Sequence, residues 1–195
     1  NKFEELQKLH RAGIPTIESV STEYYNSAPI ARYHPRRLGE ALEGVPTPHS
    51  ACDYYVRHVS GLVREFVVHS FLGKSIRAGE KVPQPNLLVS PTAEQWFQSP
   101  HVWAHPWIKT PAMGWSVDYT VPSTPSLRAL AHKALRVLDL NFAEVSIGQF
   151  DTGGLIVLSV EKAPDLSGHR SLAAYHKAIT RWMQLHQIGD SHAQL

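Results

Sequence analysis

The sequence of 195 residues contains little cysteine and little charge. Its single cysteine, Cys52, excludes an intramolecular disulfide and a Cys-x-x-Cys metal site, and it indicates a reducing compartment. Charged residues make up 18% of the chain and hydrophobic residues 43%, a balance that excludes an intrinsically disordered protein. Apolar runs such as Leu155–Leu158 are only four residues long, whereas a membrane-spanning helix needs ~20. We therefore expect a folded protein that does not span a bilayer.

Several common functional signatures are also missing. The chain has no GxGxxG, GxxxxGK[ST] or GxSxG motif, which argues against a dinucleotide fold, a P-loop and a serine-hydrolase elbow. Its formal charge is only +2 and its longest basic block is Arg36–Arg37, so we do not expect nucleic acid as a partner. Among 12 histidines, His101 and His105 are four residues apart, but prolines flank them and no third zinc ligand is indicated.

Helical periodicity is clear in three segments. A helix is expected over Lys2–Arg11, where Gly13 ends it. A second helix is expected over Ser126–Leu138, with Ser126 or Ser123 as its N-cap. The third helix, Ser171–Leu185, is expected to place four apolar residues on one side: Leu172, Tyr175, Ile179 and Met183.

The strand signals favour antiparallel pairs. Tyr- and Val-rich or alternating segments predict strands over Pro29–Tyr33, Cys52–Val59, Arg64–Leu72, Ser75–Ala78, Glu144–Gly148 and Leu155–Val160. A tight turn at Gly73–Lys74 predicts one hairpin, and the Asp151–Gly154 turn predicts another. Helices segregated from mainly antiparallel strands indicate the α+β class.

The segment between residues 81 and 110 contains five prolines and three tryptophans, with little periodicity. We expect an irregular surface excursion over the sheet. Its tryptophans, Trp96, Trp103 and Trp107, form a candidate anchor patch for another protein chain.

Three groups of segments resemble the ATP-grasp superfamily, in particular the ligases related to glutathione synthetase and ribosomal-S6 modification. Residues 12–16, Ala-Gly-Ile-Pro-Thr, resemble the family's "AGIPTP" strand entry. Residues 53–59, 64–69 and 73–76 resemble its "YV", "EYRVHV" and "GKVI" segments. Residues 138–147 and 155–172 resemble "LGLDFGAVDI" and "YVLEVNTAPGLEGTSL". The resemblance covers nearly the whole chain apart from the loops.

The resemblance implies a fold, cofactors and a reaction. It implies two small α+β subdomains, residues 1–78 and residues 79–195, the second carrying the Pro- and Trp-rich loop at about 82–112. The family's substrate domain would precede Asn1, and we expect it to be absent here because the chain begins with Asn1 rather than Met. The implied cofactors are ATP and Mg²⁺, and the implied reaction joins a carboxylate to an amine. The residues implied for nucleotide binding are Arg32, Tyr55, Val56, Lys74 and Lys81.

The positions that the family uses for magnesium and phosphate have changed. Ser146 and Ser159 occupy two carboxylate positions and Glu161 an Asn position, so Glu161 is the one remaining candidate ligand. Mg²⁺ prefers carboxylates, and a neutral hydroxyl is a poor replacement. Val67 stands where the family has an arginine, and residues 33–39 hold only one glycine where a Gly-rich phosphate loop is expected.

These changes predict a protein that has lost ligase activity and serves as a binding or structural module. The expected location is the cytoplasm or a particle such as a bacteriophage virion. Two alternatives stay open. One is an active ligase acting on a small-molecule carboxylate, with magnesium held by Glu161 together with Asp118, Asp151 or Asp165. The other is a nucleotide sensor that binds without turnover.

Overall fold

The computed structural model describes residues 2–20, 30–32, 54–56, 59, 61–91, 95, 98–104, 109–164 and 169–191. In this part of the chain the α-helices are α1 (Lys2–Arg11), α3 (Pro125–Leu138) and α4 (His169–Ser191). The strands of the main sheet are β4 (Leu62–Phe71), β5 (Lys74–Pro83), β8 (Trp115–Asp118), β9 (Phe142–Phe150) and β10 (Leu155–Glu161). Short strands are β1 (Ser19–Val20), β2 (Ile30–Arg32), β3 (Tyr54–Val56), β6 (Leu88–Val89) and β7 (Trp103–Ala104), and a 3-10 turn, η2, covers Pro111–Met113.

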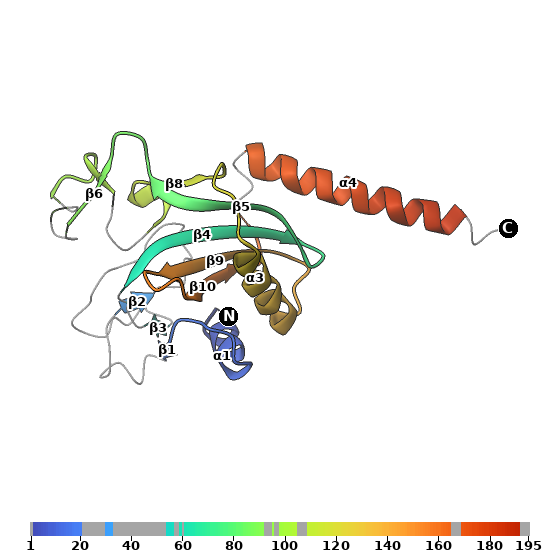
Figure 1. The fold of residues 1–195 in the computed structure, drawn as a ribbon, viewed down its shortest axis with the longest axis horizontal. Helices are drawn as coiled ribbons and strands as arrows, with labels where there is room; N and C mark the ends of the chain where they lie inside the picture. The colour runs from blue at the N-terminus through green and yellow to red at the C-terminus, as the bar shows by residue number, and fades with distance from the viewer. Residues whose placement is uncertain are drawn as a thin grey trace.

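The main sheet is antiparallel, with strand order β10-β9-β4-β5-β8 (Figure 1). The hairpins β4–β5 and β9–β10 therefore lie side by side, although 58 residues (84–141) separate them along the chain. Two small sheets accompany it, an antiparallel one in the order β1-β3-β2 and a parallel pair, β6-β7. The expected α+β class with mainly antiparallel strands is confirmed.

The β4–β5 hairpin turns one residue earlier than expected. The turn residues are Leu72 and Gly73, with φ of 48° and 71°, and Lys74 already belongs to β5 and pairs with Phe71. A two-residue hairpin turn with positive φ at both positions matches the twist of the flanking strands, which explains why glycine occupies the second position. The Gly73–Lys74 prediction was therefore wrong by one residue, whereas the four-residue turn between β9 and β10 is confirmed.

Helix α3 covers one face of the main sheet and forms the core with it. Apolar residues on its inner side pack against alternate residues of β4, β9 and β10, in a cluster that includes Leu127, Leu135, Phe66, Val145 and Val157. The helix begins after Thr124, whose Oγ1 accepts a hydrogen bond from the Leu127 N–H at 3.3 Å. The N-cap is thus Thr124 and neither predicted serine, because Pro125 takes the first helical position, where its missing N–H has no cost.

One strand of the main sheet, just after the proline- and tryptophan-rich segment, was not predicted from the sequence. β8 pairs with β5 from Glu80↔Asp118 to Pro83↔Trp115 and forms the sheet edge. The proposed subdomain boundary between residues 78 and 79 falls inside β5, whose partners β4 and β8 come from both halves. The division into 1–78 and 79–195 stays a prediction.

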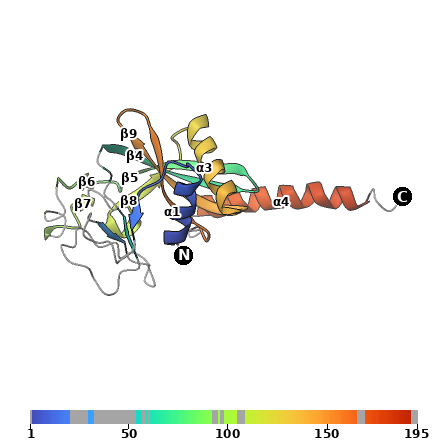
Figure 2. The ribbon, with the colours of Figure 1, turned by 90° about the horizontal axis from the view of Figure 1, so that it is seen from below.

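Helix α4 is longer than expected and extends beyond the end of the sheet in both views (Figures 1 and 2). The four apolar residues expected on one side belong to α4 at spacings of three, four and four residues, as expected. Only Tyr175 among them is buried, and Leu172, Ile179 and Met183 are exposed. No helix in the described part of the chain is long and apolar enough to cross a membrane.

Candidate functional site

The main sheet has a second face, opposite α3, on which polar side chains gather. Side chains alternate between the two faces along each strand, and residues paired across an antiparallel ladder share a face. The residues next to the core residues along each strand therefore lie on the face opposite α3. We call it the polar face and define it by Glu65, Val67, His69, Arg77, Gly79, Lys81, Glu144, Ser146, Ser159 and Glu161. The three residues implied for magnesium belong to it.

Ser146 and Ser159 are direct cross-strand neighbours at the centre of the polar face. Ser146 of β9 pairs with Ser159 of β10 on one side and with Val67 of β4 on the other. The structure therefore brings together Ser146 and Ser159, two positions that the resemblance implied for magnesium. Two hydroxyls and an isopropyl group carry no charge, so this row cannot balance a divalent cation.

Glu161 has a structural partner. Its carboxylate forms an ion pair with Lys2 in the first turn of α1, and the next residue, Lys162, forms a second ion pair with Glu5 at 2.7 Å. These two pairs tie the end of β10 to α1. In the described part of the chain no group of three or more His, Cys, Asp or Glu could hold a metal ion. The residues present at the family positions therefore do not fit magnesium, and we derive no chemistry from it.

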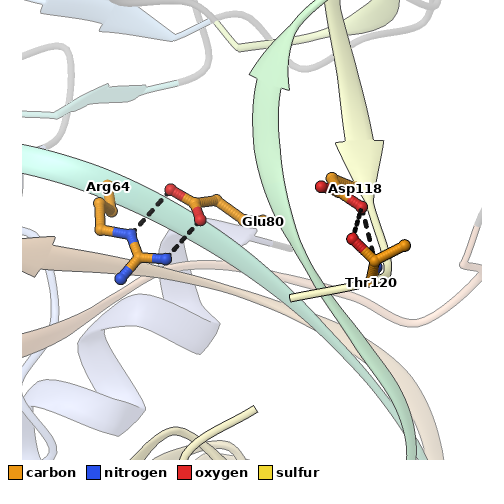
Figure 3. Close-up of polar contacts among 4 residues, drawn as sticks. All are labelled: Arg64, Glu80, Asp118 and Thr120. Carbon is orange, nitrogen blue, oxygen red and sulfur yellow. Dashed lines mark hydrogen bonds and ion pairs between the residues drawn. The ribbon is translucent and has the colours of Figure 1, made fainter. Parts of the chain in front are cut away.

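Two of the other carboxylates considered for a relocated metal site, Asp118 and Asp151, accept hydrogen bonds from their own neighbours along the chain. Asp118 accepts hydrogen bonds from the Thr120 N–H and hydroxyl at 2.8 and 2.7 Å, and these bonds lower the pKa of Asp118 (Figure 3). Glu80 pairs with Arg64, which donates through Nε at 2.8 Å and through a second guanidinium nitrogen (Figure 3). Asp151 lies in the β9–β10 turn, where it accepts from the Thr152 N–H. Asp165 lies outside the described residues.

A basic corner lies where β5 meets β8. Lys81 contacts the carboxylate of Glu65 across the β4–β5 ladder. Lys109, just before η2, places its Nζ 4.7 Å from the ring centroid of Trp115. Burial lowers the pKa of Lys109, while the Glu65 charge raises it and the Lys81 charge lowers it. Two lysines thus share the neighbourhood of Glu65, and among the described residues no carboxylate forms an ion pair with Lys109.

Sequence reasoning missed Lys109. The one available signal was an isolated cation at the end of the tryptophan-rich segment, and the folding of Trp115 into β8 gave it a partner ring. Such a cation–ring contact depends on tertiary structure, so spacing along the chain could not reveal it.

The remaining predicted nucleotide residues are distributed over two regions. Lys74 is exposed at the hairpin turn, seven residues along β5 from Lys81 and so roughly 23 Å away at ~3.3 Å per residue. Arg32 lies in β2 and Tyr55 and Val56 in β3, and these two strands pair in the small sheet. The structure thus groups these three on adjacent strands and separates Lys74 from Lys81.

The end of the polar face next to α4 is filled by a buried polar network. His69 is buried, with its Nε2 3.0 Å from the Tyr119 hydroxyl, which lies 3.1 Å from Ser171 Oγ of α4. The His69 ring also packs edge-on against Tyr175, whose hydroxyl donates to the Ala143 carbonyl at 3.1 Å. This arrangement gives His69 a packing role between β4, Tyr119 and the start of α4.

Three further expectations fall wholly or partly outside the described residues. Cys52, His105, Trp96 and Trp107 belong to undescribed segments. His101 is exposed, and Trp103 is half-buried in β7. The three-tryptophan patch stays a prediction, as does the expectation that His101 and His105 do not form a zinc site.

Comparison with known proteins identifies the fold. No protein-family model matches the chain, and no curated protein matches its sequence. Among solved structures, the ATP-grasp ligase PsnB complexed with a minimal precursor superposes with a TM-score of 0.54 at 14% identity, over 84% of this chain and 52% of PsnB. D-alanine–D-alanine ligase from Bacillus anthracis superposes with a TM-score of 0.55 at 11% identity, over 86% of this chain and 58% of the ligase. The chain therefore has an ATP-grasp-like fold and spans about half the length of these ligases.

Proposed function

We propose that this ATP-grasp-like chain is a binding module without magnesium-dependent ligase chemistry. One observation carries the proposal. At the positions implied for magnesium, Ser146 and Ser159 face each other as neutral hydroxyls, and Glu161 is paired with Lys2.

The physical reason is the charge that ATP-dependent ligation requires. Formation of an acyl-phosphate from ATP depends on cations that bridge and neutralise the phosphates. Oxygen-rich, negatively charged side chains hold such a cation, and the described part of the polar face lacks such a set near Ser146. Val67, in place of the arginine of the family pattern, removes a further positive group from the same row.

A second candidate function is binding of a nucleotide or another phosphate compound without metal. It rests on the basic corner, where Lys81 and Lys109 lie near the carboxylates of Glu65 and Glu80, and Lys109 forms no ion pair with a described carboxylate. An anion placed between the two ammonium groups would supply the counter-charge that Lys109 lacks among the described residues. PsnB is described in complexes with ADP and Mg, which makes a phosphate ligand the first choice of probe.

The active-ligase alternative is favoured by the fold that the chain shares with ATP-grasp ligases, but not by a carboxylate set in the described residues. Glu161 and Asp118 already have partners, and Asp151 lies in the β9–β10 turn. A structural role in a particle, with Trp103 among its contacts, remains part of the proposal as one form that a binding module could take. A precursor peptide, as in the PsnB complexes, is another form of partner.

Calorimetry with ATP tests the main proposal. We expect that Mg²⁺ does not increase the affinity for ATP over that in EDTA, and that no ADP forms with candidate carboxylates and amines. D-alanine–D-alanine ligase, treated in parallel, is the positive control. Magnesium-dependent ATP binding that is lost in Glu161→Gln would overturn the proposal and favour the ligase.

Thermal stabilisation by ATP in EDTA tests the second candidate. We expect it to disappear in the double variant Lys81→Gln/Lys109→Gln and to persist in Lys74→Gln, which removes an exposed lysine distant from the basic corner. Equal loss in Lys74→Gln would show nonspecific charge attraction and would exclude the site.

A further inference from the structure

A serine and a histidine meet on the face of the main sheet that α3 covers. Ser75 is the second residue of β5, and its Oγ lies 3.1 Å from Nε2 of His132 in α3. Both residues are half-buried, whereas their chain neighbours Lys74 and Lys133 are exposed. The pair therefore lies at the rim of the interface between α3 and the sheet, where a small solute can reach it.

A β-bulge turns Ser75 toward α3. The register between β4 and β5 shifts by one residue after His69, so that Ser70 pairs with Ser75. Without this shift Ser75 would pair with Phe71 and would lie on the polar face, because a slip of one residue moves a side chain to the other side of a sheet. Bulges often occur next to active sites, where they redirect a side chain. Here the bulge brings the Ser75 hydroxyl to His132.

A second hydroxyl lies beside the pair. Ser70 is fully buried, and its Oγ forms no hydrogen bond within the described part of the chain. As the cross-strand neighbour of Ser75 it lies on the same face, with the two Cβ atoms about 5 Å apart. A buried hydroxyl without a partner costs free energy. The Ser70 hydroxyl is therefore a donor that is available to the Ser75 oxygen when that oxygen gains negative charge.

His132 is in the form that accepts a proton. Burial lowers the pKa of its imidazole, and the charges of Arg128 and Arg136 lower this pKa further. The imidazole is therefore neutral at pH 7, and its Nε2 can accept the Ser75 proton when Nδ1 carries the ring hydrogen.

The side of α3 around His132 is basic. Arg128 and Arg136 lie one turn before and one turn after His132, and α3 contains no Asp or Glu. Arg128 donates to the carbonyl and the hydroxyl of Ser123, both at 2.7 Å. Arg136 is exposed in the last turn of the helix, so it is the cation in the better position to meet a dissolved anion.

From this geometry we propose that Ser75 and His132 form a nucleophile–base pair that cleaves small esters carrying an anionic group. Ser75 Oγ forms a bond to the carbonyl carbon of the ester while its proton passes to His132 Nε2. The bond to the leaving alcohol then breaks, and the proton passes from His132 to the alcohol oxygen. Water cleaves the acyl-serine by the same route, which releases the carboxylic acid and restores the Ser75 hydroxyl.

Two neighbours support this reaction. Ser70 donates a hydrogen bond to the Ser75 oxygen, and Arg136 pairs with the anionic group of the ester. All four residues lie on the α3 side of the sheet or on α3 itself, away from the polar face. The inference is therefore independent of the proposed function, and either one can fail without the other.

Covalent labelling tests the nucleophile. The probe is a fluorophosphonate, and mass spectrometry of the digested full chain locates the adduct, which we expect on Ser75. Labelling should be about a hundredfold slower in His132→Gln, since a general base contributes at least that factor. His176→Gln, which removes an exposed histidine of α4, should not slow it. Ser116→Ala is the matched serine control, because Ser116 is half-buried in β8 and donates to the Val82 carbonyl.

Ester hydrolysis tests the substrate class. The probes are para-nitrophenyl acetate and its ring-sulfonated analogue, which differ in one negative charge. The wild type should have the higher kcat/KM for the sulfonated ester. Arg136→Gln should remove this preference, and Lys133→Gln, the change of an exposed neighbour, should retain it. Ser70→Ala should lower kcat about tenfold with an unchanged KM, because its hydrogen bond forms only as the charge develops.

Several results would overturn the inference. They are adducts at other residues with none on Ser75, or hydrolysis that persists in Ser75→Ala. Equal labelling of His132→Gln and the wild type would show that the hydrogen bond only joins β5 to α3. Equal rates for the two esters would exclude the anionic substrate class. A thermal melt verifies each variant; should Ser75→Ala unfold, Ser75→Cys keeps a nucleophile of similar size, and failure of the esters to acylate it would also overturn the inference.

Discussion

Restoring the carboxylates at Ser146 and Ser159 tests the central reasoning about magnesium. The perturbation is the double variant Ser146→Asp/Ser159→Glu, which returns charge to two positions that face each other across β9 and β10. Directly opposed residues in an antiparallel pair have Cβ atoms about 5 Å apart, so the new carboxylates are close enough to repel each other or to hold one ion together.

The expected cost without metal follows from Coulomb's law. Two unit charges about 5 Å apart repel by about 1 kcal/mol in water and by about 3 kcal/mol at an effective dielectric constant of about 20. Ser146 is buried and Ser159 half-buried, so the variant should lie toward the upper value in EDTA. For a protein of this size about 3 kcal/mol corresponds to a decrease in Tm of roughly 6–12 °C.

Magnesium should reverse part of this loss. A ligand at a concentration of about ten times its Kd stabilises the folded state by about 1.4 kcal/mol. This corresponds to an increase in Tm of roughly 3–6 °C. The assay is thermal unfolding in EDTA and in Mg²⁺, for the wild type, the double variant and the neutral control Ser146→Asn/Ser159→Gln. Only the charged variant should respond to magnesium. A magnesium response in the wild type of the same size would refute the argument that these hydroxyls have given up the ion.

Three further perturbations test the surrounding structure. Gly79→Ala should lower the free energy of unfolding by about 1–3 kcal/mol in urea denaturation, because its Cβ would lie 2.8 Å from the Asp118 carbonyl oxygen; an unchanged midpoint would contradict the tight β5–β8 contact. Tyr175→Phe should cost about 0.5–1.5 kcal/mol in the same assay, since it removes the hydrogen bond to the Ala143 carbonyl, and a stability equal to the wild type would argue against that bond. Lys109→Met should flatten the dependence of Tm on pH between neutral pH and about 10.5. Burial lowers the pKa of Lys109 in the folded state, so in this pH interval the unfolded chain binds more protons than the folded chain. The stability of the wild type therefore rises with pH through this interval, and the variant loses that rise. Parallel Tm curves for Lys109→Met and the wild type would show that Lys109 is not desolvated.

The local elements were largely predictable. The first helix has the predicted ends, and the β9–β10 turn lies at the predicted four residues, because apolar periodicity and glycine- or aspartate-rich turns are local signals. The N-cap of α3 was wrong because several hydroxyl residues precede the helix and Pro125 selects among them. β8 was missed because prolines and tryptophans surround a short edge strand, and its partner strand in the described sheet, β5, ends more than 30 residues earlier in the sequence.

The sequence indicated which residues form the candidate site, but it indicated only part of their contacts. The motif spacing indicated that Ser146, Ser159 and Glu161 belong together, and the register confirmed that Ser146 faces Ser159. The pairing of Glu161 with Lys2 could not be foreseen, since 159 residues separate the two and no local pattern encodes that contact. The surroundings of Lys109 could not be predicted either, because Trp115 and Glu65 come near it only in the folded structure.

The sequence alone determined which chemical groups this protein can use. It placed neutral hydroxyls at two positions that the resemblance implies for magnesium, and it supplied the apolar and basic residues of α4. Tertiary structure decided what those groups do. It paired Glu161 with α1, left the second half of α4 uncovered and brought Lys109 to the polar face. The physical reason is that composition and periodicity act over a few residues, whereas ion pairing, burial and exposure depend on strands and helices that meet from distant parts of the chain.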